Sequence, residues 1–226
     1  MQNQVQLVSS FEALIECSFQ GEVNAICWKR DLSGDFSELI NQLELSENMR
    51  ELEPEDLLAL DLSEAGKQAR AILLQDLQRL KAHGAAPVLN LIQSYERDHS
   101  FPFFPRDVYS FHVDRSPIPS ETFLCTYHGE ASEIIANAEA KQKILIPEIR
   151  AQLREVFEGD DEGFDAFLSE NFFDLHYQVL ENTQATSLGI GNLWKLAIEH
   201  PESAVAPCVH RAPLEKVGEK RLLLIC

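Results

Sequence analysis

The sequence lacks the features that mark several common classes of protein. No apolar run approaches the roughly 18 residues that a membrane-spanning helix needs. The N-terminal residues also lack the basic segment and the uninterrupted apolar core of a secretory signal. Basic side chains are few: the sequence has 19 Lys and Arg but 37 Asp and Glu, which gives a formal charge of −18. Such a charge repels phosphate backbones and anionic lipids, so we expect no nucleic acid and no membrane as a partner.

Motifs for nucleotide binding and serine hydrolysis are absent as well. The sequence contains neither G-x-x-x-x-G-K-[ST] nor G-x-G-x-x-G, and it has no G-x-S-x-G. Its five cysteines are odd in number, widely spaced and without a C-x-x-C pair, which excludes a zinc ribbon and a disulfide framework. Since no secretory signal is evident, we expect reduced thiols and a cytoplasmic protein.

What remains is an ordinary globular composition. The 226 residues are 45% hydrophobic and 25% charged, which predicts a single domain over residues 1–226. Residues 1–85 are expected to be mainly helical, with one buried strand at Val23–Trp28. One helix is expected over Phe36–Leu45, and a longer one with apolar residues at helical spacing should end at His83–Gly84.

The remaining residues, 86–226, are expected to form a β-rich core. A helical insertion over about 131–175, beginning with a helix at 131–142, interrupts that core. Strands that bracket helices behind a helical layer predict an α+β fold with an antiparallel sheet or small barrel. The expected strands are Val88–Ile92, Val108–Asp114, Glu121–His128, Gly191–Ile198, Ala206–Arg211 and Arg221–Ile225.

The tripeptide His112-Val113-Asp114 is the most informative short motif. On a strand, alternate side chains share a face, so His112 and Asp114 should point the same way. One imidazole and one carboxylate are two of the three ligands of the 2-His-1-carboxylate triad that binds non-haem iron(II). A His-Asp pair at the surface is the alternative interpretation of this tripeptide alone.

Two residues near the C-terminus extend this pattern. His210 follows an apolar segment, and Arg221 opens the next apolar strand. This order resembles the iron(II)/2-oxoglutarate dioxygenases, whose fold is a double-stranded β-helix. The resemblance implies a helical N-terminal layer packed on a C-terminal cupin-like jelly roll. It also implies that His112, Asp114 and His210 hold iron(II), and that Arg221 pairs with the distal carboxylate of 2-oxoglutarate.

Longer segments resemble the family named domain of unknown function 1826, over nearly the whole chain. They are VYSFHVDRSPIPSETFLCTYHGEASEII, GIGNLWKLAI and CVHRAPLEKVGEKRLLLIC. That family has no assigned reaction. Its genes often neighbour zinc-homeostasis GTPases, so the resemblance implies a link to metal supply and a metal-homeostasis protein as a partner.

Three further residues are candidates for the surroundings of the metal. His128 ends the strand after the H-x-D motif, next to Tyr127, and could reach the site if the strands pair antiparallel. Cys208 shares the face of His210 on a regular strand and would favour zinc. The alternatives are a solvent-facing histidine and a buried core cysteine. His176 is expected to be a packing residue.

The sequence therefore leaves three functions open. The first is an iron(II)/2-oxoglutarate-dependent oxygenase acting on an unidentified small molecule, which the spacing of Arg221 favours. The second is a non-catalytic zinc-binding protein of metal homeostasis, with Cys208 or His128 closing the site; the five cysteines favour it. The third is a metal-free cupin-like scaffold that binds a small acidic ligand or a protein.

Overall fold

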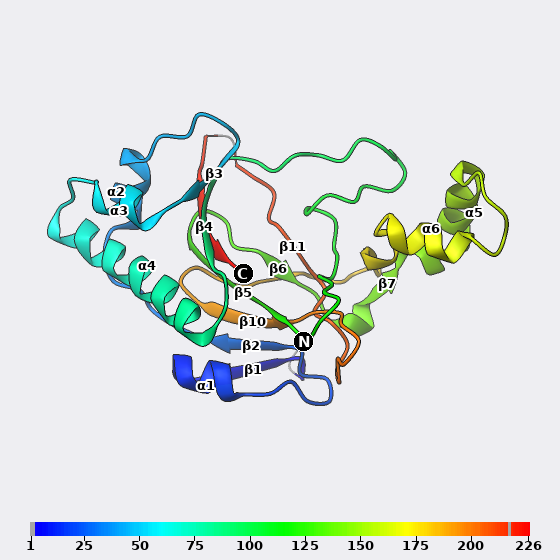
Figure 1. Cartoon of the computed structure of the whole chain (residues 1–226), viewed down its shortest axis with the longest axis horizontal. Coiled ribbons are helices and arrows are strands. Elements are labelled where there is room, and N and C mark those ends of the chain that lie inside the picture. The colour runs from blue at the N-terminus through cyan, green and yellow to red at the C-terminus, as the bar shows by residue number, and fades with distance from the viewer. Residues whose placement is uncertain (1–2, 217) are drawn as a thin grey trace.

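A seven-stranded mixed sheet organises the chain, of which the computed structural model describes residues 3–216 and 218–226. The protein combines helices and strands in one mixed α and β structure, as the sequence predicts (Figure 1). The strand order is β1-β2-β10-β5-β12-β4-β3, and all neighbours are antiparallel except β1 and β2. These strands are β1 (Val5–Val8), β2 (Ala25–Trp28), β3 (Met49–Leu52), β4 (Val88–Ile92), β5 (Glu121–His128), β10 (Leu193–Ala197) and β12 (Arg221–Ile225).

The first 85 residues contain more strand than the sequence predicts. β2 confirms the strand expected at Val23–Trp28, but β1 and β3 were not expected. Both are four residues long and lie at the two edges of the sheet, β1 beside β2 and β3 beside β4. Short edge strands depend on pairing with a neighbour more than on their own residues. The prediction of a single strand in this part was therefore wrong.

Four helices accompany these strands: α1 (Phe11–Glu16), α2 (Phe36–Gln42), α3 (Pro54–Leu58) and α4 (Glu64–His83). The long helix α4 begins after Ser63, whose hydroxyl accepts a hydrogen bond from the Gly66 N–H. It ends at Gly84, which has the left-handed conformation (φ +95°) that glycine adopts without strain. The predicted end of the helix at His83–Gly84 is confirmed.

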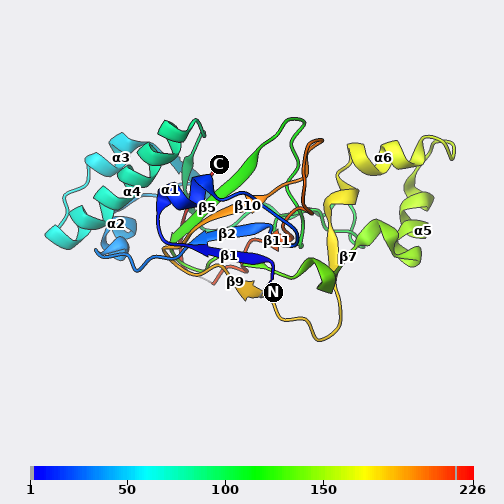
Figure 2. The ribbon, with the colours of Figure 1, turned by 90° about the horizontal axis from the view of Figure 1, so that it is seen from below.

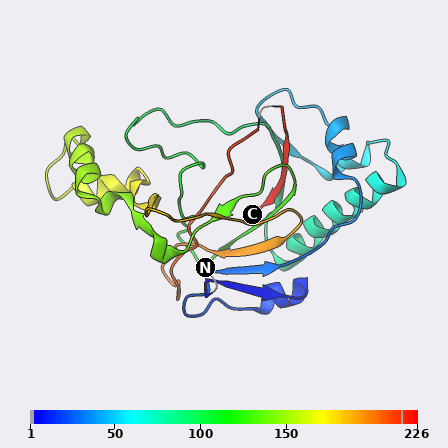
Figure 3. The same ribbon diagram turned by 180° about the vertical axis from the view of Figure 1, so that it is seen from behind.

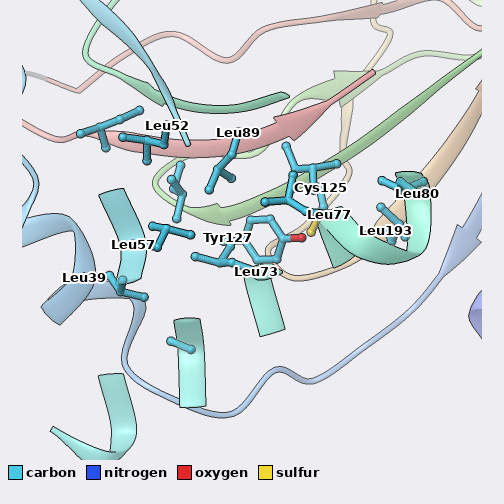
Figure 4. Packing of buried hydrophobic residues seen from close by; sticks show 14 of the residues in the cluster. Leu39, Leu52, Leu57, Leu73, Leu77, Leu80, Leu89, Cys125, Tyr127 and Leu193 are labelled. Carbon is cyan, nitrogen blue, oxygen red and sulfur yellow. The ribbon is translucent and has the colours of Figure 1, made fainter. Parts of the chain in front are cut away.

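The helices α2 to α4 lie together against one face of the sheet, at the opposite end of the molecule from α5 and α6 (Figures 1 and 2). Leucines of α3 and α4 pack there on β4, β5 and β10, as Figure 4 shows. Side chains of β5 alternate between the two faces of the sheet. Those that face the helices are Phe123, Cys125 and Tyr127, and those that face the other way are Thr122, Leu124 and Thr126.

The other face of the large sheet packs against a small one. This second sheet has the order β11-β6-β9, with β6 (Glu133–Ile134), β9 (Thr186–Ser187) and β11 (His210–Arg211). In the view of Figure 2, β9 lies on the opposite side of the large sheet from α3 and α4. A second apolar cluster fills the space between the sheets. It joins Ile134 of the small sheet to Leu124, Trp194 and Leu223 of the large one.

The expected strand Val108–Asp114 is not formed as such. Only His112 pairs, through single bridges to His210 and to His176. Residues 107–110, which precede His112, form a turn in which the Ser110 N–H donates to the Asp107 carbonyl. They are therefore not part of a strand. Similarly, β11 is shorter than the strand predicted over Ala206–Arg211.

The helical insertion is also smaller than predicted. The helix expected at 131–142 is wrong: this segment holds β6 and then β7 (Ala140–Gln142), which pairs with β8 (Tyr177–Val179). Pairing of the buried Ile134 with His210 overrides the helical propensity of its neighbours. The helices α5 (Pro147–Val156) and α6 (Phe164–Glu170) follow, with Pro147 in the first turn of α5.

Both α5 and α6 project from the end of the molecule at which β7 lies, a position best seen from behind (Figure 3). A phenylalanine-rich cluster holds them together and includes Phe104, Phe164 and Phe173. Within the described residues, no helix has the length and apolarity needed to cross a membrane.

Candidate metal centre

The structure brings His112, Asp114 and His210 together at one edge of the small sheet. His112 and His210 lie directly opposite each other and exchange two backbone hydrogen bonds, each of 2.9 Å. The Nε2 atom of His112 is 4.0 Å from Asp114 Oδ1, and that of His210 is 3.7 Å from Asp114 Oδ2. One ligand atom from each of the three residues lies within 4.8 Å of the others. The three residues that the sequence singles out thus converge on one point.

The rest of each ligand side chain is held in place by a hydrogen bond. The Nδ1 atom of His112 is 2.7 Å from the Ser110 carbonyl, and that of His210 is 3.1 Å from the Cys208 carbonyl. Because a carbonyl only accepts, the neutral form of each ring carries its proton on Nδ1 and presents the lone pair of Nε2. Metal-bound histidines in proteins are oriented by such contacts.

The carboxylate of Asp114 is fixed in a similar way. The Thr122 hydroxyl donates to its Oδ2 over 2.6 Å, from the face of β5 that looks away from the helices. Burial acts to raise the pKa of Asp114, but His210 and the Thr122 hydroxyl together hold it below its usual range. The carboxylate is therefore ionised at neutral pH.

His112 is neutral under the same conditions. Its burial, with a smaller contribution from the adjacent His210, lowers its pKa to about 4. Divalent metals bind the neutral imidazole and the ionised carboxylate. His112 and Asp114 therefore have the protonation states that metal binding requires.

The spacing of the ligand atoms also suits a metal. Nitrogen and oxygen ligands bind first-row metals at about 2.0–2.2 Å, which places neighbouring ligand atoms roughly 3 Å apart. The present separations, up to 4.8 Å, call for each side chain to close in by roughly 1 Å. Two imidazoles and one carboxylate leave further coordination positions open for other ligands.

A cavity of about 500 Å³ opens beside this triad. Two arginines border it, and both are already paired: Arg106 with Asp98 at 2.8 Å, and Arg115 with Glu199 at 3.1 Å and with Asp174. The other lining residues are Asp98, Asp107, Val108, His112, Val113, Asp114, Asn171, Phe172, Leu175 and His176. The cavity thus has room for a small molecule next to the triad.

Arg221 does not border this cavity. Its guanidinium is buried and donates to the hydroxyls of Ser132 (2.7 Å), Thr126 (3.1 Å) and Tyr95 (3.3 Å). Within the described residues, no carboxylate forms an ion pair with it, and its Nε atom has no hydrogen-bond partner. Burial lowers the pKa of Arg221. It is a buried cation without a direct counter-charge.

Strand β5 relates Arg221 to the triad. Thr122 contacts Asp114 and Thr126 contacts Arg221, four residues apart on one face, or about 13 Å along a strand. Between them stands Leu124, which packs in the apolar cluster between the sheets. The triad and Arg221 therefore lie on the same inner surface but are separated by apolar side chains.

The structure does not bring the side chains of Tyr127, His128 and Cys208 to the triad. The Tyr127 hydroxyl donates to Asp76 on the helix-covered face of the sheet. His128 lies at the far end of β5 from Thr122, with its Nδ1 3.5 Å from the Ser37 hydroxyl. Cys208 contributes its carbonyl to His210, but burial raises the pKa of its thiol to about 12 and keeps it protonated.

His176 is the site residue that sequence reasoning missed. It borders the cavity, pairs with His112 across a bridge, and its ring centroid lies 5.8 Å from that of His112. No local pattern indicates this role, because the contact with His112 depends on where the chain returns after α6.

A comparison with protein families, with characterised proteins and with solved structures finds no match to this chain. The site is therefore interpreted from its own geometry and chemistry.

Proposed function

We propose that the protein is a metal-dependent enzyme of the non-haem iron(II) oxygenase type, with His112, Asp114 and His210 as the metal ligands. One observation carries the proposal: both Nε2 atoms and the Asp114 carboxylate face one point, while the remaining polar atoms of these rings are held by carbonyls. A histidine pair that served packing alone would not need this orientation.

The order of the strands supports a double-stranded β-helix as the scaffold. From β4 onward, the segments of the two sheets follow one another in the order large, small, large, small, small, large, small, large, and β4, β5, β10 and β12 belong to the large sheet. The bridge at His112 and the strands β6, β9 and β11 belong to the small side. Two facing groups of four segments are the number that a jelly roll requires.

A bound iron(II) would be held by His112, Asp114 and His210 and would supply oxygen activation. The protein residues hold the ligands and admit the substrate. The carbonyls of Ser110 and Cys208 fix the imidazole tautomers, and Thr122 orients the carboxylate. Val108, Leu175 and Phe172 give the cavity an apolar portion that can position a substrate carbon beside the metal.

The 2-oxoglutarate part of the proposal depends on Arg221. A buried guanidinium without a carboxylate partner is costly, and an anion would offset that cost. A 2-oxoacid that reached from the triad to Arg221 would have to displace the apolar packing around Leu124. The metal site and the 2-oxoglutarate site are therefore tested separately.

The first test is made without oxygen. Iron(II) and then 2-oxoglutarate are added to metal-free protein, and the visible charge-transfer band of a chelated 2-oxoacid is recorded. We expect a band that Asp114→Ala abolishes because iron is not bound. We expect Arg221→Met to weaken 2-oxoglutarate by about 10- to 100-fold at unchanged iron affinity, the effect of losing a charged hydrogen-bonded pair.

The outcomes separate the candidate functions. If iron binds but no charge-transfer band appears, the proposed metal site stands and the proposal that 2-oxoglutarate binds is rejected. Tight zinc and no iron affinity would favour the zinc-binding alternative and the link to metal homeostasis implied by the resemblance to domain of unknown function 1826. Equal metal retention by the unmodified protein and by Asp114→Ala would reject the triad.

A further inference from the structure

Three histidines form a row across the small sheet. His112 lies in the middle, with His210 bridged to it on one side and His176 on the other. The second pair is flanked by backbone hydrogen bonds from Val113 N–H to Leu175 O (3.0 Å) and from Tyr177 N–H to Phe111 O (2.8 Å). Directly opposed residues of antiparallel strands project to the same face. His176 therefore points to the side on which the two proposed ligands lie.

The surroundings of the His176 ring leave only its Nε2 atom available to a group in the cavity. The residue is only 4% exposed, and its Nδ1 atom is buried without a hydrogen-bond partner. The edge of the ring packs near Phe104, with 6.0 Å between centroids. A buried N–H without an acceptor is unfavourable, so the neutral ring carries its proton on Nε2. Since His176 also borders the cavity, Nε2 is the nitrogen that can serve a group bound there.

The distances argue against His176 as a direct ligand. The ligand atoms that lie within 4.8 Å of one another come from His112, Asp114 and His210 alone among the described residues. Its ring centroid is 5.8 Å from that of His112, whereas the rings of His112 and His210 are 4.5 Å apart. His176 thus stands one layer further out than the ligands.

We propose that His176 is a positioning residue, whose Nε2–H donates a hydrogen bond to the small oxygen or nitrogen ligand bound at an open position of the metal. This inference rests on the proposed metal site and adds to it the group that recognises the exogenous ligand. A phenylalanine would fill the same volume among Phe104 and Phe173 but would offer no donor.

The test uses the full chain loaded with cobalt(II), whose visible spectrum reports both metal binding and the addition of azide. His176→Phe keeps an aromatic ring, and His176→Gln keeps an N–H at a position similar to Nε2. We expect cobalt affinity within about threefold of the unmodified protein in both variants. Azide affinity should fall about tenfold in His176→Phe, the value of one hydrogen bond, and should be restored in His176→Gln.

A matched control replaces a histidine outside the cavity, His83→Phe, which lies exposed at the end of α4. It should change neither affinity. Unchanged azide affinity in His176→Phe would show that His176 is a packing residue and overturn the inference. A large loss of cobalt in both His176 variants would make it a metal ligand, which also overturns it. Failure of the unmodified protein to bind cobalt would reject the metal site itself, and the inference with it.

Discussion

Two carboxylates, Asp76 and Asp114, lie against opposite faces of β5 and have different surroundings. Asp76 of α4 is 1% exposed and accepts hydrogen bonds from Arg30 at 2.9 and 2.7 Å and from Tyr127 at 2.7 Å. Asp114 has a side chain that is 33% exposed, and it accepts one hydrogen bond, from Thr122. Its other neighbours are the Nε2 atoms of His112 and His210, beyond hydrogen-bond distance.

The difference separates a structural cluster from the proposed metal-binding one. Around Asp76, donors and acceptors satisfy one another, and the cluster ties α4 to β2 and β5. Around Asp114, three acceptor atoms face one another at close range, which is an arrangement that a divalent cation stabilises. Replacing residues of the two clusters should therefore affect different properties.

The largest expected effect is on stability, in Asp76→Ala. This change leaves the Arg30 guanidinium buried without its partner, so the free energy of unfolding should fall by about 3–5 kcal/mol in urea denaturation. Metal affinity, measured where the variant is still folded, should stay within about threefold. The double variant Arg30→Met/Asp76→Leu should recover most of the stability. An equal loss in the double variant would contradict this assignment.

Asp114→Ala should show the opposite pattern. Removal of the only carboxylate ligand should weaken cobalt(II) or iron(II) by more than about 100-fold in equilibrium dialysis, beyond the effect of losing a second-layer contact. The unfolding free energy of the metal-free protein should change by less than about 1 kcal/mol, because Asp114 makes one hydrogen bond and is partly exposed. A loss of stability comparable to that of Asp76→Ala would assign Asp114 a structural role.

The pH dependence of the metal-free protein should reveal the histidine row. Burial lowers the pKa of His112 to about 4 and that of His176 to about 3, against about 6.5 in an unfolded chain. Only the unfolded state then takes up protons below pH 6.5, so stability falls as the pH is lowered. The slope between about pH 6 and 5 should approach 1.4 kcal/mol per unit for each histidine. His176→Phe should lower the slope by about the contribution of one histidine. Equal slopes in urea melts of both proteins would contradict this.

The smallest effect is expected from Thr122→Val. The loss of the hydroxyl that holds Asp114 Oδ2 should weaken metal binding by about tenfold, the lower end of such effects. Thr126→Val is the matched control on the same face of β5, since Thr126 contacts Arg221 and not the triad. Dialysis against cobalt(II) should give equal affinities for Thr126→Val and the unmodified protein. Equal losses in both variants would point to a general effect on β5.

Much of the site follows from the sequence, for a local reason. His112 and Asp114 share a face because they are two residues apart in an extended segment, and this holds although the predicted strand is only a bridge. His210 was found because its place before a strand matched a known order of ligands. The end of the long helix at Gly84 is likewise local and was predicted.

The rest of the site depends on long-range pairing. His176 joins the row only because the chain returns from α6 beside His112, which no local pattern encodes. Alternation of side chains along β5 predicts that Tyr127 shares a face with Phe123 and lies opposite to Thr122. It does not predict which of the two faces carries the site. The edge strands β1 and β3 were missed for the same reason: their partners, not their residues, make them strands.

The interleaving of distant segments has a consequence for how fast the protein folds. In the large sheet Leu193 pairs with Trp28, and Ile225 pairs with Val88, so the central ladders close very long loops. Proteins dominated by such contacts fold in milliseconds to seconds rather than microseconds, because the chain loses the entropy of closing a long loop before the contacts stabilise it. We expect His112 and His210 to meet only after these ladders form, so metal capture should be a late event in folding.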